Sequence, residues 1–261
     1  FKLRGINFTI SAACASGSHS IGLGYHFIKT GLQDCVVCGG AQEISHLSMG
    51  SFDALSAFSI HESIPSKASR PFDRDRDGLI PSGGAATVIL ESLESAQKRG
   101  ATILGEVVGY GFSSNGGHIS NPTVDGPVRS LYKALKDAGL QADDIDYINA
   151  HATSTPAGDS SEAKAIHEVF GSHRPYVSST KSMTGHLLGA AGAIEAIAAI
   201  FSIVNDTIPP TINFSVPDPE IDQRLNLTFN KAQKRKVNVA ISNTFGFGGH
   251  NASVVLKKAE V

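Results

Sequence analysis

Short apolar runs alternate with helix-like patterns along the chain, and this alternation constrains the fold more than any other feature. The strand-like runs cover residues 6–10, 36–37, 85–91, 103–110, 147–149, 176–178, 237–242 and 252–257. The helical patterns cover residues 18–29, 92–99, 128–137, 159–170 and 186–204. Strands that alternate with helices predict an α/β fold with a largely parallel sheet and helices on both faces.

Composition excludes several classes of protein. The chain has 261 residues, 41% hydrophobic and 18% charged, so it can bury a sizeable core. The formal net charge of -2 argues against nucleic-acid and anionic-membrane partners. Three cysteines are too few for a disulfide framework and are typical of a reducing compartment. The apolar stretch at residues 189–204 carries Glu195 near its middle, so we expect no membrane span and a cytoplasmic protein.

A weak internal repeat divides the chain. Residues 6–22 and 176–194 each contain a strand-like run, a small polar loop and a helix rich in glycine and alanine. The repeat predicts two related halves, at residues 1–98 and 99–261, of which the first is truncated. The chain opens on Phe1 rather than Met, so we expect a fragment or a processed piece. Any organelle-targeting signal would then lie upstream.

Cys14 is a candidate nucleophile. It lies in the segment SAACASG, residues 11–17, between a strand-like run and a helix. A sulfur at a helix N-terminus meets free N–H groups and the positive end of the helix dipole, which favour the thiolate. The dipole contributes about 0.3–1 kcal/mol and at most about 2, which lowers a thiol pKa by about one unit. A small buried cysteine without reactivity fits the local sequence equally well.

Cys35 and Cys38 match the C-x-x-C spacing of metal and redox sites. They lie in a strand-like run, where positions three apart point to opposite faces. No second ligand pair occurs elsewhere in the sequence, so we interpret both as structural cysteines and expect no metal site.

Two histidines lie in segments rich in small and hydroxyl-bearing residues. His151 follows a strand-like run in NAHATSTPAGD, residues 149–159. Ligands bind at the carboxyl ends of strands in open α/β sheets. His186 lies in KSMTGHLLGAAG, residues 181–192, five residues after Lys181 and at the start of a small-residue helix. Most lone histidines are structural, but these settings favour a functional role.

Three carboxylates accompany the histidine segments. Asp159 precedes a helical pattern with Glu162 three residues on, which predicts an N-cap and a variant of the capping box. Glu195 follows His186 by nine residues, two and a half helical turns, so the two should lie on opposite sides of the helix. We therefore expect Glu195 to be a buried carboxylate paired with another neighbour.

A glycine loop, NTFGFGGH at residues 243–250, lies between the last two strand-like runs. It is no phosphate-binding loop, because no helix follows and the G-K-S/T ending is absent. Glycine allows the backbone to approach a ligand closely. We interpret the loop as presenting a backbone N–H to a reacting oxygen, with Phe247 as an apolar gate.

Together these segments resemble the β-ketoacyl-acyl-carrier-protein synthases, the condensing enzymes of fatty-acid elongation of types I and II. Residues 13–17 are similar to the nucleophile motif, 151–159 and 181–192 to the two histidine motifs, and 243–251 to the gating loop. The resemblance implies a thiolase-like fold, layered α/β/α/β/α, from which roughly the N-terminal third of the usual enzyme is absent.

The resemblance also implies a reaction. An acyl thioester and malonyl-acyl carrier protein would undergo a decarboxylating Claisen condensation to β-ketoacyl-acyl carrier protein. Cys14 would carry the acyl group, and its N–H and that of Phe247 would form the oxyanion hole. His151 and His186, as neutral Nε2–H donors, would stabilise the enolate, and Lys181 would orient the network and keep both imidazoles neutral.

Supporting roles follow from the same resemblance. Phe245 and Gly246 would belong to the gate, Thr153 and Thr155 would bind the pantetheine arm, and Glu195 and Asp159 would hold local structure, with a cation as an optional ligand. No organic cofactor or metal is implied. The partners would be acyl carrier protein and a second copy of the chain in a homodimer. The alternative is an inactive fragment or a non-catalytic partner subunit of a condensing enzyme.

Three departures from the family pattern bear on acyl-chain preference more than on catalysis. Ala152 stands where glycine is usual, and His250 stands where threonine is usual. Residues 79–82, with the sequence LIPS, replace a strand entry that usually contains phenylalanine.

Overall fold

The computed structural model describes residues 2–260 and is built around a six-stranded mixed sheet in the order β3-β10-β9-β4-β5-β7. These strands are β3 (Glu106–Ser114), β4 (Tyr147–Asn149), β5 (Tyr176–Ser178), β7 (Asn226–Leu227), β9 (Val239–Gly246) and β10 (His250–Lys257). The strands β9, β4, β5 and β7 are parallel, whereas β10 is antiparallel to both neighbours. The sheet is thus largely parallel, as expected, and the antiparallel edge arises because a tight glycine turn after β9 makes a hairpin with β10.

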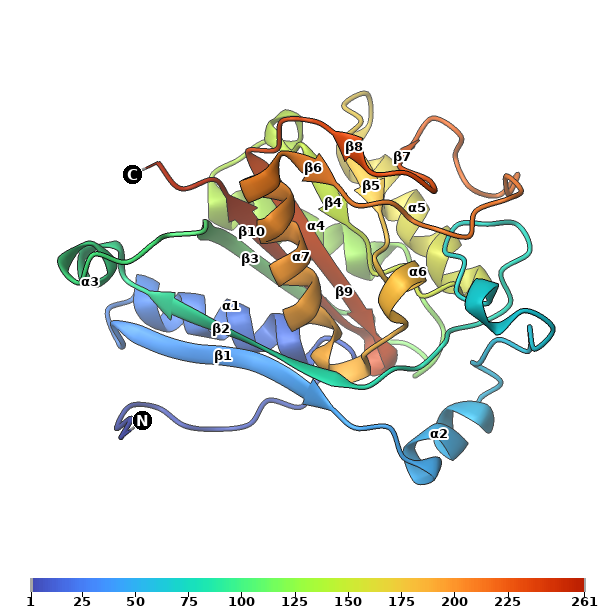
Figure 1. Ribbon diagram of the computed structural model, residues 1–261, viewed down its shortest axis with the longest axis horizontal. Coiled ribbons are helices and arrows are strands. Elements are labelled where there is room, and N and C mark those ends of the chain that lie inside the picture. Colours follow the sequence, from blue (N-terminus) through green and yellow to red (C-terminus); the bar gives the residue numbers. More distant parts are fainter. Residues whose placement is uncertain (1, 261) are drawn as a thin grey trace.

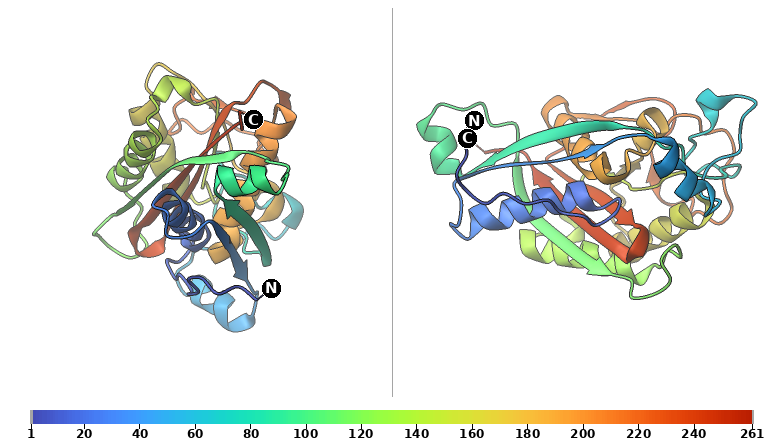
Figure 2. Two further views of the ribbon diagram at one scale, coloured as in Figure 1. Left: turned by 90° about the vertical axis from the view of Figure 1, so that its left-hand side faces the viewer. Right: turned by 90° about the horizontal axis from the view of Figure 1, so that it is seen from below.

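The elements form successive layers, seen edge-on in Figure 2. An antiparallel pair of strands, β1 (Cys35–Gln42) and β2 (Gly84–Glu91), forms one outer layer. The helices α1 (Ser16–Lys29) and α7 (Ala191–Asn205) lie between this pair and the six-stranded sheet. The helices α4 (Asp125–Ala138) and α5 (Pro156–Phe170) cover the opposite face of the large sheet (Figure 1).

This arrangement is the thiolase-like layering in the order β/α/β/α. Within residues 2–260, no helical layer covers the outer face of the β1–β2 pair. Val37 and Ile89 on that pair are consequently 50% and 64% exposed. Cys35 is exposed and Cys38 buried, as expected for strand positions that point to opposite faces.

Small residues let the two central helices approach closely. A Cβ atom added to Gly17 of α1 would lie 2.8 Å from the backbone N of Ala193 in α7. A Cβ added to Gly192 of α7 would lie 2.5 Å from the backbone N of Ser18 in α1. Both contacts are shorter than packed atoms allow, so glycine is required where the helices cross. The glycine and alanine content of both repeat segments thus serves helix–helix packing.

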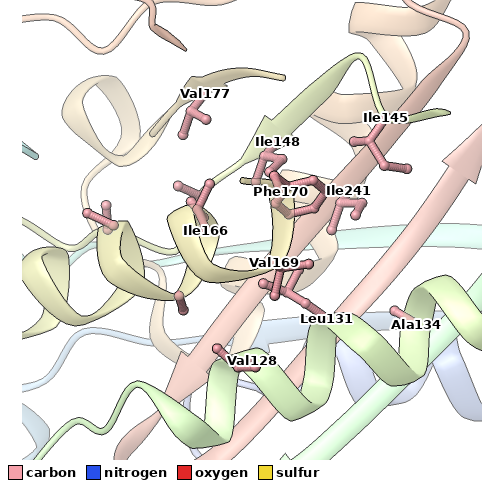
Figure 3. Close-up of a cluster of buried hydrophobic side chains, with 14 of the residues drawn as sticks. Val128, Leu131, Ala134, Ile145, Ile148, Ile166, Val169, Phe170, Val177 and Ile241 are labelled. Atoms are coloured by element: carbon pink, nitrogen blue, oxygen red, sulfur yellow. The ribbon is translucent and has the colours of Figure 1, made fainter. Parts of the chain in front are cut away.

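The largest core lies between the six-stranded sheet and its outer helices (Figure 3). Leu131 of α4 and Ile166 of α5 meet Ile148 of β4 and Ile241 of β9 there, all with 1% exposure or less. Each buried side chain of this size contributes about 1.5–3 kcal/mol relative to an exposed one. The core fixes β4 and β9, whose carboxyl ends lead into the functional segments.

The remaining elements are short. They are α2 (His46–Asp53), α3 (Leu93–Lys98), α6 (Lys181–Thr184), β6 (Thr207–Ile208), β8 (Gln233–Lys234), and the 3-10 turns η1 (Pro65–Lys67), η2 (Ala142–Asp144), η3 (Leu188–Ala190) and η4 (Phe247–Gly249). The segment Leu188–Asn205 is long and apolar enough to cross a membrane by composition, but 56% of it is buried between the two sheets, as in a core helix.

Two predicted elements differ from those observed. Residues 6–10 are not a strand, and Ile6 and Phe8 are 48% and 53% exposed, because no described strand lies beside them to pair with. The helix predicted over residues 186–204 begins only at Ala191. The glycine at 185 and the turn η3 break the helical pattern, so His186 lies in an extended loop. The division of the chain at residue 98 stays a prediction.

Candidate active site

Cys14 lies on a sharp turn just before α1. The preceding residue, Ala13, has a φ of +48°, a strained value for a side chain other than glycine. The sulfur lies beside His186, whose Nε2 is 3.1 Å from Sγ. The backbone N–H groups of Phe247 and of Cys14 itself also point at the sulfur. A thiol, an imidazole and two backbone donors therefore meet at one point.

The thiol of Cys14 is held in its neutral form. Burial raises its pKa to about 11, while the N–H of Phe247 and the charge of Lys181 oppose that rise. The lowered pKa expected from the helix N-terminus is therefore wrong. The dipole is worth about 2 kcal/mol at most, and burial of an anion in an apolar site outweighs it.

The two histidines lie side by side at the sulfur. The rings of His151 and His186 are 5.2 Å apart between centroids and meet edge to face at 85°. Burial lowers both pKa values well below 6.5, and the charge of Lys181 lowers them further. Both imidazoles are therefore neutral at pH 7, as expected, although burial rather than Lys181 is the main cause.

The tautomer of His186 follows from its surroundings. Its Nδ1 atom is buried with no hydrogen-bond partner among the described residues, and so is that of His151. A buried donor without an acceptor costs free energy, whereas Nε2 of His186 has the sulfur beside it. The proton of His186 therefore belongs on Nε2, facing Cys14.

Glu162 holds the loop that carries His151. Its side chain accepts hydrogen bonds from the backbone N–H of His151 at 2.9 Å and of Ala152 at 2.7 Å. Asn243 of β9 donates to the same carboxylate at 3.2 Å. Burial raises the pKa of Glu162 to about 6, and these N–H donors oppose the rise. Glu162 thereby joins the end of β4, the helix α5 and the start of the glycine loop.

The sequence interpretation missed this role, since it treated Glu162 as part of a capping box with Asp159. The helix α5 instead begins at Pro156 with Thr155 as its N-cap. Asp159 lies one turn inside, where it accepts hydrogen bonds from the backbone N–H of Phe72 at 2.9 Å and of Ser154 at 3.1 Å. Proline is favoured at the first position of a helix, so α5 begins at Pro156 and not, as the sequence analysis predicted, after Asp159. The available signal was a pair of carboxylates, Asp159 and Glu162, at the start of a helix that continues with small and apolar residues.

Arg76 is a second residue that the sequence interpretation missed. It is buried, donates to the carbonyl oxygen of Pro156 and to Ser160 Oγ, both at 2.9 Å, and pairs with Asp218. The charge-dense string RPFDRDRDG, residues 70–78, was available as a signal. Arg76 fixes the N-terminus of α5 and thus the far end of the His151 loop.

Lys181 and Glu195 form a buried ion pair beneath the histidines. Both side chains are 1% exposed, and Nζ of Lys181 contacts Oε1 of Glu195. Burial raises the pKa of Glu195 to about 7, and the ammonium group opposes that rise. Glu195 is thus the buried, paired carboxylate that its helical position predicted. Lys181 does not line the cavity and acts on the site through its charge, so a catalytic role for it stays a prediction.

Breaking this ion pair is expected to destabilise the protein. Lys181→Met leaves the Glu195 carboxylate buried without its partner, and we expect a loss of about 3–5 kcal/mol in the free energy of unfolding. The double variant Lys181→Met/Glu195→Leu removes both charges and should recover most of that loss. Urea denaturation measures both. If Lys181→Met were as stable as the parent protein, the result would contradict an ion pair in which both Lys181 and Glu195 are charged.

The glycine loop closes over the sulfur. A Cβ atom on Gly246 would lie 3.0 Å from the backbone N of Cys14. Gly248 and Gly249 have φ values of +79° and +77°, which glycine adopts without strain. The ring of Phe247 packs on that of Phe52, with centroids 5.9 Å apart, and the ring of Phe245 lies 6.1 Å from that of His151. The loop thus brings a backbone donor and two aromatic rings to the site.

These groups surround a cavity of about 330 Å³, within the range of small-molecule sites. Its wall includes Cys14, His151, His186, Phe245, Gly246, Phe247, Thr153 and Thr155. The hydroxyl oxygens of Thr153 and Thr155 are 3.1 Å apart. Within residues 2–260, no group of three or more His, Cys, Asp and Glu side chains is arranged to hold a metal. Both oxygens of Asp159 accept backbone N–H groups, and a cation at Asp159 or Glu195 stays a prediction.

The raised thiol pKa predicts how Cys14 reacts with pH. Below about pH 11 the thiolate fraction is small and rises tenfold per pH unit, so alkylation by iodoacetamide should increase from about pH 7 to about pH 10 without a plateau. Mass mapping of the Cys14 peptide measures the rate. Lys181→Met should slow alkylation further, because the lysine charge lowers the pKa. A plateau below about pH 9 would contradict the effect of burial.

Comparison with known proteins identifies the family. Residues 1–96 match the model of the β-ketoacyl synthase N-terminal domain, and residues 104–215 match that of the C-terminal domain. The chain belongs to the β-ketoacyl synthase family. Two similar curated relatives are the 3-oxoacyl-[acyl-carrier-protein] synthases 2 of Synechocystis, at 46% identity, and of Rhizobium meliloti, at 47%. Each alignment covers 98% of this chain and 62% of the relative.

Solved structures of β-ketoacyl synthases share the fold. One from Burkholderia phymatum superposes with a TM-score of 0.93 at 42% identity, over 96% of this chain and 61% of that one. A type II polyketide ketosynthase bound to its acyl-carrier protein gives a TM-score of 0.93 at 35% identity, over 96% and 62%. The chain therefore spans a little over three fifths of the proteins it matches.

Proposed function

We propose that this protein is an acyltransferase that condenses an acyl thioester with malonyl-acyl carrier protein and releases CO₂ and β-ketoacyl-acyl carrier protein. The observation that carries the proposal is the contact between Cys14 and His186, 3.1 Å from Sγ to Nε2, with the N–H of Phe247 directed at the same sulfur. The names of the curated relatives, 3-oxoacyl-[acyl-carrier-protein] synthase 2, support the substrate class.

The first stage is acyl transfer to the enzyme. The sulfur of Cys14 attacks the thioester carbonyl, and the thiol proton passes to the departing pantetheine sulfur. The carbonyl oxygen becomes an oxyanion between the N–H groups of Cys14 and Phe247. Each preorganised donor of this kind is worth roughly 3–4 kcal/mol of transition-state stabilisation. The thiolate is the attacking species, so the raised pKa of Cys14 makes loss of the thiol proton to the departing pantetheine sulfur part of this stage.

The second stage is decarboxylation and condensation. Cleavage of the bond between the malonyl α-carbon and its carboxylate leaves an electron pair that forms a thioester enolate and releases CO₂. The enolate oxygen accepts hydrogen bonds from Nε2–H of His151 and His186, both of which are neutral at pH 7 because burial lowers their pKa values. The α-carbon then attacks the acyl carbonyl, and the sulfur of Cys14 leaves and regains a proton. No cofactor takes part in this scheme.

The other assignments complete the proposal. Phe245, Gly246 and Phe247 gate the cavity, and Thr153 and Thr155 bind the pantetheine arm of the acyl carrier protein. The protein acts in the cytoplasm as a homodimer, with residues 1–98 and 99–261 as its two related halves. A solved relative in complex with an acyl-carrier protein supports this class of partner.

The decisive experiment is acyl transfer to the protein itself. We expect intact-mass spectrometry after incubation with an acyl thioester to show one added acyl group, located on the Cys14 peptide. The alternative, a non-catalytic fragment or partner subunit, predicts no added mass. The presence of Cys14 and the similarity to 3-oxoacyl-[acyl-carrier-protein] synthases favour the condensing enzyme.

A further inference from the structure

A second cavity, of about 360 Å³, lies at the C-terminal end of α5 and is called the distal cavity below. It is formed by the end of α5, by residues 171–175 before β5, and by Arg224 and Leu225 before β7 (Figure 1). The His151 loop adjoins the opposite end of α5. No residue lines both the distal cavity and the cavity around Cys14. The distal cavity is therefore a separate place on the molecule.

The floor of the distal cavity is apolar. Ile166 and Phe170, which α5 contributes to the main core (Figure 3), both line it and are 1% and 3% exposed. Leu225 lines the cavity as well and packs against the same core. A buried aliphatic and aromatic floor favours an apolar group of a ligand, and the volume is within the range of small-molecule sites.

The guanidinium group of Arg224 is fixed at the rim. Its Nε donates to the Asp222 carboxylate at 3.0 Å and its Nη2 at 2.9 Å, while Nη2 also lies 3.3 Å from Nε2 of His167. The Nδ1 atom of His167 contacts the same carboxylate at 2.8 Å. Hydrogen bonds from Arg224 lower the pKa of Asp222 to about 2, so the carboxylate is charged at neutral pH. Nη1 of Arg224 takes no part in these contacts and is left to meet a ligand.

Arg174 is the second cation at the rim. Within residues 2–260, no carboxylate oxygen lies within 4 Å of its guanidinium group, and no Asp or Glu side chain lines the distal cavity. Asp143, 3.9 Å from Nδ1 of His173, is 85% exposed and lies outside the lining. The negative end of the α5 dipole opposes an anion, but bidentate pairing of arginine with an anionic oxygen group is the stronger effect.

We propose that the distal cavity binds a phosphate monoester that carries an aromatic or other compact apolar group. Arg174 and Arg224 hold the phosphate, and the floor takes the apolar group. A phosphate monoester has three terminal oxygens and a charge of about -1.5 to -2 at neutral pH, which suits two guanidinium groups better than a carboxylate with two oxygens and one charge. The inference is independent of acyl transfer to Cys14.

The test is isothermal titration calorimetry of the whole chain at about 0.15 M salt, where exposed charges are screened. The probes are phenyl phosphate, inorganic phosphate, benzoate and benzyl alcohol. Phenyl phosphate should bind most tightly, inorganic phosphate and benzoate about tenfold more weakly, and benzyl alcohol not at all. Arg174→Ala should weaken phenyl phosphate about tenfold and Arg174→Glu should abolish its binding. Leu225→Ala should weaken phenyl phosphate a few-fold and leave inorganic phosphate unchanged.

Arg99→Ala is the matched control. Arg99 is 60% exposed and pairs with Glu91, much as Arg224 is 63% exposed and pairs with Asp222, and it lines neither cavity. Phenyl phosphate should bind this variant as it binds the parent protein, and thermal melting shows that each variant is folded. Absence of binding at millimolar phenyl phosphate, unchanged binding in Arg174→Glu or an equal loss in Arg99→Ala would overturn the site. Benzoate that binds as tightly as phenyl phosphate would overturn the choice of a phosphate.

Discussion

Cys14→Ala is expected to abolish acyl-enzyme formation and to lower condensation about a million-fold, the effect of deleting a covalent nucleophile in other enzymes. The side chain removed is the one proposed to carry the acyl chain, since its Sγ lies beside His186 and the two backbone donors. Part of the malonyl decarboxylation should persist, because His151 and His186 still face the cavity.

Two assays separate these outcomes. Intact-mass spectrometry measures acylation, and release of labelled CO₂ from malonyl-acyl carrier protein measures decarboxylation. Cys38→Ala is the control, because Cys38 is also buried but lies in β1 and does not line the cavity. Condensation retained in Cys14→Ala would refute Cys14 as the nucleophile.

His186→Ala should reduce decarboxylation roughly 100-fold to 1,000-fold, the usual cost of removing one hydrogen-bond donor to a developing oxyanion. The variant removes one of two Nε2–H donors to the enolate oxygen and leaves His151 alone. Acyl transfer should fall less, since the N–H groups of Cys14 and Phe247 remain. His186→Gln keeps a neutral N–H donor of similar reach and should recover part of the decarboxylation.

The histidine prediction has its own control. His167→Ala removes a partly exposed imidazole of α5 that pairs with Asp222 and does not line the cavity, so decarboxylation should be unchanged. A decarboxylation rate in His186→Ala equal to that of the parent protein would remove His186 from the mechanism. Loss of both acylation and decarboxylation, with an altered melting temperature, would instead indicate a structural role.

The local hydrophobic pattern predicted the helices and strands correctly where the apolar residues of an element pack into the core. The strands Tyr147–Asn149 and Tyr176–Ser178 are observed as expected, and the helical pattern at residues 128–137 lies within α4. The prediction was wrong for residues 6–10, where an extended apolar run has no neighbouring strand in the described part of the chain. A strand exists only as part of a pair, and a pattern within one segment does not show whether its partner is present.

The helix over residues 186–204 shows the second kind of failure. Alanine and glycine spacing suggested one continuous helix, but the backbone hydrogen bonds of His186 go to Ile80 and Ser82, which are more than a hundred residues away. Long-range pairing outweighed helix propensity and left the imidazole in an extended loop beside the sulfur. Glu162 was misjudged for the same reason, because its partners lie in the His151 loop and not in its own first turn.

The sequence alone determined which chemical groups the site contains and to which family the chain belongs, because the cysteine, histidine and glycine segments occur in a specific order along the chain. It also determined that the centre would be an α/β sheet, since hydrophobic periodicity is a local property. The tertiary structure decided the protonation states. Burial raises the pKa of Cys14 to about 11, against the local dipole argument, and it is also the main cause that lowers the pKa values of both histidines. Desolvation depends on everything that surrounds a side chain, and most of that surrounding protein comes from distant parts of the chain.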